Sequence, residues 1–460
     1  MTAPDRSATH AAHATNRSAT LADALFGAAE LLNAVIHGRT LDSALAASPF
    51  TGAARAAAMD LAYSTLRDFG RGDFLLSQLM TSPVKDAAVR GLLLAALTRL
   101  EARPEDAHTT VDQAVGAAAR IAGGNFKGLT NGVLRSFERR ADTLCADADA
   151  NETARWRHPG WWQTRVRKDH PDAWQAILSA GNMRPPMALR VNHRRVSSVD
   201  FLATLTAAGI AGRISGNTAG NTAGKPIGNP ADNTAILLDK PLPVDRIPGF
   251  GEGLCSVQDP GAQLAAGLLD CADGMRVLDA CAAPGSKTAH LLERHELDLL
   301  ALDADAGRAT RINENLTRLG LCATVRVEDC RDVSKWWDGQ PFDRILADVP
   351  CTASGVVRRH PDAKWLRRAG DVAQFARTQV EIMDSLWRTL APGGKMLYAT
   401  CSVFSEENTR QVAAFVGRHA DALRLPTIAT SIDGSGAALE LHLLPDGNHD
   451  GFFYALLQKR

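Results

Sequence analysis

The sequence predicts an α/β protein with three parts: an N-terminal all-α domain, a small α/β connector and a larger C-terminal domain. The N-terminal part is rich in Ala and Leu, and its apolar residues recur at the spacing of amphipathic helices. After Pro248, short and almost continuously apolar strands alternate with amphipathic helices. This alternation predicts a doubly wound parallel sheet that helices cover on both faces. The expected boundaries are 1–20 for a disordered N-terminus, 21–150 for the helical domain, 151–260 for the connector and 261–460 for the last domain.

At least five helices are expected in the N-terminal domain, because five segments carry apolar residues every three or four positions. These segments are residues 21–36, 53–69, 87–101, 109–122 and 125–140. Composition alone leaves open whether this domain binds a partner or is a plain scaffold.

The connector begins with a basic stretch that also carries tryptophans. Clustered cations suit phosphate groups and aromatic rings can stack on unpaired bases, so the stretch is a candidate RNA contact. The alternative is that the tryptophans pack at the junction between domains. The residues concerned are Arg155, Trp156, Arg157, Trp161, Trp162, Arg165, Arg167, Lys168, Trp174, Arg184, Arg190, Arg194 and Arg195.

A low-complexity insertion is expected within the connector at residues 213–234. It repeats the unit GNTAG and contains almost no large apolar side chain. Such a segment cannot bury enough surface to order itself, so we expect a flexible excursion and assign no function to it.

The C-terminal domain is expected to contain five parallel strands and two final antiparallel ones. The parallel strands are predicted at residues 276–280, 297–303, 323–327, 342–349 and 395–400. Helices are expected from Ser286, at 306–319, at 371–390 and at 405–419. The segments 439–445 and 451–457 are predicted to form the pair of strands that closes the sheet.

Composition excludes several classes of protein. The chain has 51 Lys and Arg residues against 51 Asp and Glu, so net charge indicates no nucleic-acid partner, and only local clusters can. Eight cysteines without a CxxC pair disfavour a zinc site and a disulfide framework. No apolar run approaches the roughly 18–20 residues of a membrane span, and no signal peptide is evident. We therefore expect a cytoplasmic monomer without a metal or membrane partner.

A small-molecule site is predicted where the first strands end. Asp279 ends the first strand, and residues 281–287, CAAPGSK, turn into the next helix. Asp303 ends the second strand, where an acidic residue accepts hydrogen bonds from ribose hydroxyls, and Asp329 follows the third. Neither a P-loop nor a GxGxxG pattern is present. The pattern therefore favours a nucleoside-containing cofactor that is bound by a loop of neither of these two kinds.

Two cysteines at predicted strand ends indicate the chemistry. Cys351 lies in DVPC, three positions after Asp348, and Cys401 lies in TCS fifty residues later. Carbon 5 of a pyrimidine is a poor nucleophile, but addition of a thiolate at carbon 6 makes it reactive. A cysteine beside an acidic residue and a methyl-donor pocket would serve such an alkylation.

These motifs resemble a known family. CAAPGSK, DVPC and TCS occur in the order typical of RNA cytosine-C5 methyltransferases that use S-adenosylmethionine. HPGWW, RPPMALRVN, PGFGEGLCSVQDPGAQ, VVRRHPDAKWLRR and DGFFYALL are similar to the bacterial RsmB (Sun/Fmu) family, and NGVLRSFERR resembles its NusB-like domain. The resemblance covers residues 21–460 except the insertion. It implies a Rossmann-like methyltransferase domain, a NusB-like RNA-binding domain and 16S rRNA as the partner.

Residue by residue, the resemblance implies Cys401 as the nucleophile, Cys351 as the cysteine that assists product release, and Asp348 as a catalytic carboxylate. The residues it implies for S-adenosylmethionine are Cys281, Ala282, Ala283, Pro284, Gly285, Ser286, Lys287, Asp303, Asp329 and Asp348. Ser286 stands where some members have Gly and Val349 where many have Ala, and neither change removes a reactive group.

The implied activity is methylation of carbon 5 of a cytosine in 16S rRNA. One alternative is the same chemistry on tRNA or another rRNA site, and a second is a non-catalytic RNA-binding assembly factor. RNA backbone contact is expected from the loop after Cys351, although a solvated loop would have the same composition. Its charged residues are Arg358, Arg359, Lys364, Arg367 and Arg368. A base within a hairpin would have to be flipped out to reach Cys401.

Overall fold

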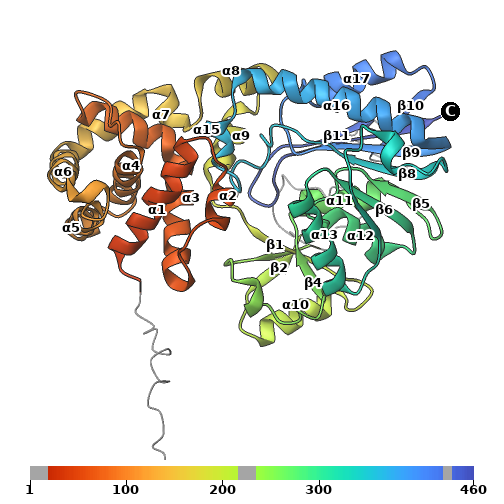
Figure 1. Cartoon of the computed structure of the whole chain (residues 1–460), viewed down its shortest axis with the longest axis horizontal. Coiled ribbons are helices and arrows are strands. Elements are labelled where there is room, and N and C mark those ends of the chain that lie inside the picture. Colours follow the sequence, from red (N-terminus) through yellow and green to blue (C-terminus); the bar gives the residue numbers. More distant parts are fainter. Residues whose placement is uncertain (1–18, 216–234, 428–437) are drawn as a thin grey trace, which may run out of the picture. The chain divides into compact units, whose positions relative to one another are not determined.

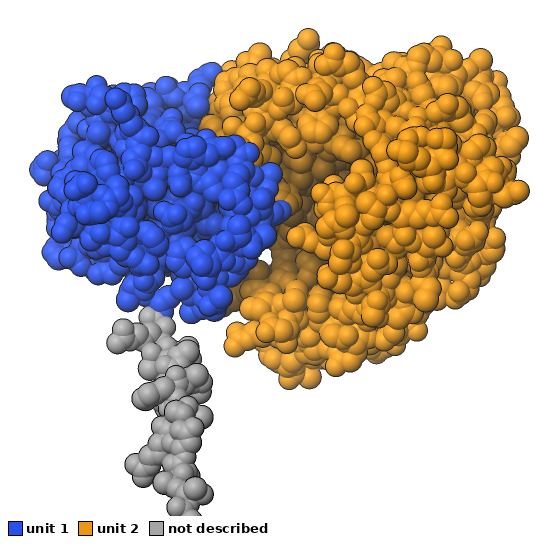
Figure 2. All heavy atoms as spheres, viewed as in Figure 1, with its two compact units in different colours: residues 1–157 blue, residues 158–460 orange. Residues whose placement is uncertain are grey.

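A computed structural model describes residues 19–215, 235–427 and 438–460. The chain divides into two compact units, residues 1–157 and residues 158–460, which Figure 2 colours separately. The predicted boundary between helical domain and connector, at residue 150, lies close to this division. Most of the predicted insertion, residues 216–234, falls outside the described residues.

Unit 1 is built of helices, and all five predicted segments are helical. Two of the helices are longer than predicted, since α3 continues to Leu79 and α6 to Ala150. The helices are α1 (Leu21–Ile36), α2 (Leu41–Ala46), α3 (Gly52–Leu79), α4 (Ala87–Ala102), α5 (Ala107–Ala118), α6 (Lys127–Ala150) and α7 (Glu152–Trp156), with 3-10 turns at Pro104–Asp106 and Ala122–Gly124.

Helix α4 forms the centre of this unit. Its residues from Leu92 to Leu97 are all buried, which requires neighbours on every side of the helix. At the start of the unit, the side chains of Thr20 and Asp23 cap helix α1 reciprocally. Thr20 was expected to be disordered with residues 1–19, and the capping box corrects that expectation for this residue.

The connector contains a small antiparallel sheet. Its strands are β1 (Met187–Val191), β2 (Gly212–Ile214), β3 (Ile236–Leu238) and β4 (Cys255–Val257), in the order β2-β3-β1-β4. Helix α10 (Ser198–Ala207) packs its buried Phe201 and Leu205 against this sheet. Residues 213 and 214, which were assigned to the flexible insertion, belong to β2 and pair with β3. Helices α8 (Gly160–Asp169) and α9 (Trp174–Asn182) precede the sheet.

The sheet of the C-terminal domain has eight strands, and the five predicted parallel strands all form. Its order is β10-β12-β9-β8-β5-β6-β7, and β11 pairs with residues 452–455 of β12 on the same edge as β10. The strands are β5 (Arg276–Asp279), β6 (Asp298–Asp303), β7 (Thr324–Val327), β8 (Phe342–Asp348), β9 (Leu390–Thr400), β10 (Ala422–Leu425), β11 (Glu440–Leu443) and β12 (Phe452–Lys459). The last three are antiparallel to their neighbours, as the final pair of strands was predicted to be.

Helices cover both faces of this sheet (Figure 1). Neighbouring residues of one strand point to opposite faces, so Val277 packs with helices α11, α12 and α13, and Leu278 packs with α14, α16 and α17. The helices are α11 (Pro260–Leu268), α12 (Ser286–Arg294), α13 (Ala306–Leu319), α14 (Val333–Trp336), α15 (Ala363–Leu366), α16 (Ala369–Thr389) and α17 (Thr409–Arg418), with a 3-10 turn at Val244–Arg246.

The strand order reverses beside β5, which places a ligand crevice. From β5 the chain continues to β6 and β7 on one side, then crosses to β8 and β9 on the other. Loops that leave the carboxyl ends of β5 and β8 therefore diverge and leave a crevice between them. The predicted cofactor loop and the predicted Cys351 loop are the two that follow these strands.

Candidate active site

The loop from β5 to α12 is fixed by backbone hydrogen bonds to the neighbouring strands. The amide of Ala280 donates to Leu346 O at 3.0 Å, and the amide of Ala282 donates to Leu302 O at 2.8 Å. Gly285 has a φ of 91°, and a Cβ there would lie 3.1 Å from Ile312. A glycine is therefore required where this loop turns into the helix.

Asp303 ties this loop to the end of β6. Its Oδ2 accepts the amide of Ala283 at 3.1 Å, and its Oδ1 accepts the amide of Asp305 at the same distance. Arg308 approaches Oδ2 at 3.6 Å. The carboxylate is buried, but it borders a cavity and has lone pairs left for a ligand.

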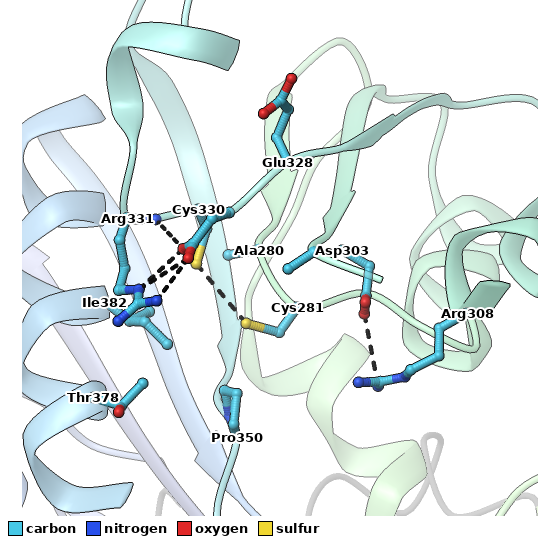
Figure 3. Close-up of a pocket in the computed structure, with 12 residues that line it drawn as sticks. Ala280, Cys281, Asp303, Arg308, Glu328, Cys330, Arg331, Pro350, Thr378 and Ile382 are labelled. Carbon is cyan, nitrogen blue, oxygen red and sulfur yellow. Dashed lines mark hydrogen bonds and ion pairs between the residues drawn. The ribbon is translucent and has the colours of Figure 1, made fainter. Parts of the chain in front are cut away.

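The cavity opens at the carboxyl ends of β5, β6 and β7, and Figure 3 shows its walls. Cys281, Asp303 and Asp329 of the predicted cofactor residues line it; the sequence did not indicate the contributions of helix α16 or of Pro350. The full lining is Ala280, Cys281, Asp303, Ala304, Arg308, Glu328, Asp329, Cys330, Arg331, Pro350, Thr378 and Ile382. Carboxylates on one side and apolar side chains on the other suit a ribose and a flat base.

Asp329 is less available than predicted, because it is held by a neighbour. Arg331 donates to it at 2.7 Å and also pairs with Glu381 on α16 at 2.6 Å. The hydrogen bonds from Arg331 lower the pKa of Asp329. Asp329 thus remains a carboxylate, and its hydrogen bonds fix the wall of the cavity.

Cys281 lies opposite a second cysteine that the sequence did not indicate. Its sulfur is 4.0 Å from that of Cys330 across the cavity wall (Figure 3). The hydrogen bond to Cys330, together with burial, raises the pKa of Cys281 well above its ordinary value. Cys281 is therefore a thiol at neutral pH and not a candidate nucleophile.

The two predicted catalytic cysteines meet. Strands β8 and β9 are parallel neighbours, and the amide of Val349 donates to Ala399 O at 3.1 Å where they end. Their following loops therefore leave the same edge of the sheet, and the sulfurs of Cys351 and Cys401 lie 3.4 Å apart. Cys401 is the more exposed of the two.

The environment of Cys351 favours its protonated form. The hydrogen bond with Cys401, burial and the charge of Glu407 raise the pKa of Cys351 well above its ordinary value. A buried thiol that can donate a hydrogen bond to a neighbouring sulfur stabilises a thiolate on that neighbour. Cys351 is therefore placed to donate a hydrogen bond to Cys401, the more exposed of the two sulfurs.

Lys287 and Asp348 form an ion pair instead of lining the cavity. The Lys287 ammonium lies 2.6 Å from Asp348 Oδ2. Burial acts to lower the pKa of Lys287, but the charge of Asp348 and a smaller contribution from Cys401 outweigh it and raise that pKa. A protonated lysine thus lies within electrostatic range of Cys401, which is the arrangement that stabilises a thiolate.

Glu407 is the functional candidate that sequence analysis missed. Its buried carboxylate accepts the amide of Thr352 at 2.8 Å and the hydroxyls of Thr352 and Ser402 at 2.6 and 2.5 Å. Thr352 follows Cys351 and Ser402 follows Cys401, so one carboxylate joins both cysteine loops. The only sequence signal was an acidic residue six positions after Cys401.

Several cations that were expected to contact RNA have structural partners instead. Arg190 is buried and donates to both carboxylate oxygens of Glu293, at 2.7 and 2.8 Å. Arg358 is buried against Asp450, and Lys364 is buried with its ammonium 2.9 Å from Asn182 Oδ1. These three predictions of RNA contact were wrong, since a buried cation with a partner cannot reach a phosphate.

Arg359 is also engaged, in ion pairs with Asp259 and Asp450. Among the tryptophans, Trp162 is buried and packs on Phe404, so the alternative of packing was correct for it. Trp161 is only half-buried and lines a surface pocket.

That surface pocket lies between helix α8, the start of α16 and the loop from β9 to α17. Two of its cations are in ion pairs: Arg165 with Glu406 at 2.5 Å, and Arg410 with Asp169 at 3.8 Å. Lys168 is exposed, with its charge toward solvent. The lining residues are Trp161, Thr164, Arg165, Lys168, Asp169, Ala369, Glu406 and Arg410.

Comparison with known proteins identifies the family. Residues 266–458 match the sequence profile of the 16S rRNA methyltransferase RsmB/F family, residues 158–219 match its ferredoxin-like domain, and residues 19–139 match the NusB family. The chain is 43% identical over 441 residues to ribosomal RNA small subunit methyltransferase B of Pseudomonas putida, covering 94% of this chain and 97% of that protein. The protein of the same name from Vibrio cholerae is 39% identical over 440 residues, with 94% and 96% covered.

The chain belongs to the RsmB/F family of 16S rRNA methyltransferases.

The folds of solved structures agree with this membership. The crystal structure of PH0851 superposes with a TM-score of 0.75 at 21% identity, covering 96% of this chain and 99% of that one. The structure of NSun6 from Pyrococcus horikoshii with SFG gives a TM-score of 0.54 at 19% identity, covering 65% and 98%. As an RsmB/F methyltransferase, the chain is an S-adenosylmethionine-dependent enzyme that acts on rRNA, with a NusB-like helical domain and a Rossmann-like catalytic domain.

Two other kinds of feature are absent from the described residues. In residues 19–215, 235–427 and 438–460, no helix is both long and apolar enough to cross a bilayer. Over the same ranges, the RsmB/F chain shows no group of three or more His, Cys, Asp or Glu side chains arranged to hold a metal ion.

Proposed function

We propose that this chain methylates carbon 5 of a cytosine in 16S rRNA through a covalent bond between Cys401 and the base. The observation that carries the proposal is the 3.4 Å separation of the Cys351 and Cys401 sulfurs beside the Lys287–Asp348 ion pair. Methylation of an exocyclic amino group would need no thiolate, whereas alkylation of carbon 5 does.

Cys401 would act first. Its thiolate adds to carbon 6 of the cytosine, and the electrons of the double bond between carbons 5 and 6 move into the ring. Asp348 would hydrogen-bond the N3 and amino edge of the ring and hold it in the electron-poor form that the thiolate attacks. Lys287, paired with Asp348 at 2.6 Å, would stabilise both that carboxylate and the thiolate.

Product release requires a second step. Carbon 5 carries one proton too many after it has been alkylated, so this proton must leave before the double bond can re-form. When its electron pair returns to the ring, the bond between carbon 6 and Cys401 breaks. Once Cys401 is bonded to carbon 6, the neighbouring Cys351 would ionise and accept the carbon 5 proton. Cys401 would then leave as a thiolate, which accepts a hydrogen bond from the re-formed Cys351 thiol.

The cavity at the ends of β5, β6 and β7 fits S-adenosylmethionine, which supplies the electrophilic methyl group when bound. Asp303 has lone pairs toward the cavity for the ribose hydroxyls, and Ile382 and Pro350 offer apolar surface for the adenine. The backbone of residues Cys281 to Lys287 would lie along the cofactor, since hydrogen bonds fix this loop to both neighbouring strands.

We propose that RNA binds to the part of the surface where cations are exposed to solvent. Lys168 is exposed beside the half-buried ring of Trp161, and Arg368 is exposed at the start of α16. Phosphates would pair with these cations and an unstacked base could lie on the tryptophan. The NusB-like helical domain, for which we retain the boundary at about residue 150, would bind a further part of the rRNA.

The decisive test incubates purified protein, S-adenosylmethionine and a 16S rRNA transcript, then identifies the modified nucleoside by mass spectrometry. We expect 5-methylcytidine from the wild type and none from Cys401→Ala, which should bind S-adenosylmethionine unchanged in calorimetry. Cys322→Ala, which changes an exposed cysteine, is the matched control and should retain activity. Turnover by Cys401→Ala, or a methyl group elsewhere on the base, would overturn the proposal.

A further inference from the structure

Glu407 makes most of the hydrogen bonds to Thr352, the residue that follows Cys351. Both hydrogen-bond donors of Thr352, its amide and its hydroxyl, donate to this one carboxylate, at 2.8 and 2.6 Å. Apart from a 3.4 Å approach of the hydroxyl to Ser402, Thr352 has no other hydrogen bond in the described part of the chain. Thr352 therefore depends on Glu407 for its hydrogen bonds, and so does the peptide that follows Cys351.

The Cys401 loop is held differently, because it has anchors of its own. Asn408 Nδ2 donates to Ser402 O at 2.8 Å, and Asn408 Oδ1 accepts the hydroxyl of Thr400 at 2.6 Å. The amide of Ser402 also donates to the Thr400 hydroxyl at 3.3 Å. Removing Glu407 would thus leave Ser402 bonded to Asn408 and Thr400, whereas Thr352 would keep only its 3.4 Å approach to Ser402. The rest of the Cys351 loop would stay anchored, with Pro350 O accepting from Gln379 at 3.0 Å and Ser354 bonded to Ser402 at 2.9 Å, so the loss falls on the residue that follows Cys351.

Burying the charged carboxylate of Glu407 costs free energy. Burial raises the pKa of Glu407, because it penalises the charged form. The adjacent Glu406 is only half-buried and forms an ion pair with Arg165 at the surface pocket. The hydrogen bonds from Ser402 and Thr352 act in the opposite direction, so they offset part of the cost of the buried charge and join the two loops through one carboxylate.

We propose that Glu407 is a positioning residue that holds Cys351 against Cys401, so that the covalent enzyme–RNA intermediate is released rather than retained. The inference rests on the proposed function, in which Cys401 forms the bond to the base and Cys351 assists its breakage. Glu407 touches neither the cofactor cavity lining nor the reacting sulfurs by hydrogen bond, and it acts through Thr352 and Ser402.

This asymmetry predicts a specific defect. In Glu407→Ala the first half of the reaction, in which Cys401 attacks and the methyl group moves, should continue. Release should slow by about tenfold or more, the factor that corresponds to one lost hydrogen bond to a charged group. A covalent protein–RNA species should therefore accumulate, whereas simple destabilisation would lower both half-reactions without accumulation.

The experiment compares variants of the full chain on a denaturing gel after incubation with rRNA transcript and S-adenosylmethionine. Cys351→Ala serves as the benchmark for stalled release, and Glu406→Ala is the matched control because it removes the neighbouring carboxylate, which is only half-buried and pairs with Arg165. Glu407→Gln keeps an acceptor for the Thr352 amide and should restore most of the release. Thr352→Val keeps the side-chain shape and replaces Glu407→Ala if that variant does not fold.

The outcomes separate the inference from the proposed function. Accumulation in Cys351→Ala and Glu407→Ala, with little in Glu406→Ala and Glu407→Gln, supports the positioning role. Accumulation in Cys351→Ala alone, with Glu407→Ala and Thr352→Val releasing normally, overturns it and leaves the proposed function intact. An absence of any covalent species in Cys351→Ala would contradict the proposed roles of the two cysteines themselves.

Discussion

Replacing Asp303 by alanine tests how the cavity holds a cofactor. The carboxylate has about four lone-pair positions, and the amides of Ala283 and Asp305 occupy two of them at 3.1 Å. Two therefore remain for ribose hydroxyls. Loss of a hydrogen bond to a charged group costs about 1.5–3 kcal/mol, so the Kd for S-adenosylmethionine should rise about 10- to 150-fold. Asp303→Asn keeps the shape and one acceptor and should raise the Kd less.

Isothermal titration calorimetry measures this effect without RNA. Asp298→Asn is a suitable control, because Asp298 lies at the other end of β6 and is exposed with an ion pair to Arg276. Its Kd should equal that of the wild type, and the melting temperatures of all three variants should be compared. An unchanged Kd in Asp303→Ala would show that Asp303 only anchors the loop, and the ribose assignment would have to be abandoned.

Two further predictions concern stability and RNA binding. Burial raises the pKa of Asp279 from 3.8 to about 7, so the folded protein keeps a proton that the unfolded chain releases, and its free energy of unfolding falls as pH rises through this window. The free energy of unfolding can be measured by urea denaturation without cofactor, and between about pH 4 and pH 8 it should fall less in Asp279→Asn than in the wild type. Every tenfold change in an acid dissociation constant corresponds to roughly 1.4 kcal/mol. An equal fall in both proteins would refute this. Lys168→Glu should weaken rRNA binding and reduce the slope of log affinity against log salt by about one or more, with cofactor affinity unchanged; an unaltered slope would place the RNA elsewhere.

The local pattern of apolar and polar residues was sufficient to predict the strands and the residues at their carboxyl ends. The five parallel strands, the start of α12 at Ser286 and the bounds of α13 follow from apolar runs and periodicity, which depend only on neighbours in the chain. Strand ends in a doubly wound sheet meet at one edge, so Asp303, Cys351 and Cys401 could be expected near one another before any coordinates were known.

Tertiary structure alone decided which charges are used for function and which for folding. Arg190 and Glu293 are 103 residues apart in the chain, and Arg358 and Asp450 are 92 apart. A run of basic residues looks the same whether its cations face phosphates or buried carboxylates, because the partner is set by packing at long range. The predictions for Arg190, Arg358 and Lys364 failed for this reason.

The same limit explains why the sequence did not indicate Glu407 or the ion pair between Lys287 and Asp348. Their roles depend on which side chains face them across loops, Thr352 and Ser402 in one case and Asp348 in the other. By itself the sequence determined the order of the elements, the motifs and the reactive groups, since these are local properties. The fold decided the pairing of those groups, because side-chain direction and burial arise only when distant segments pack together.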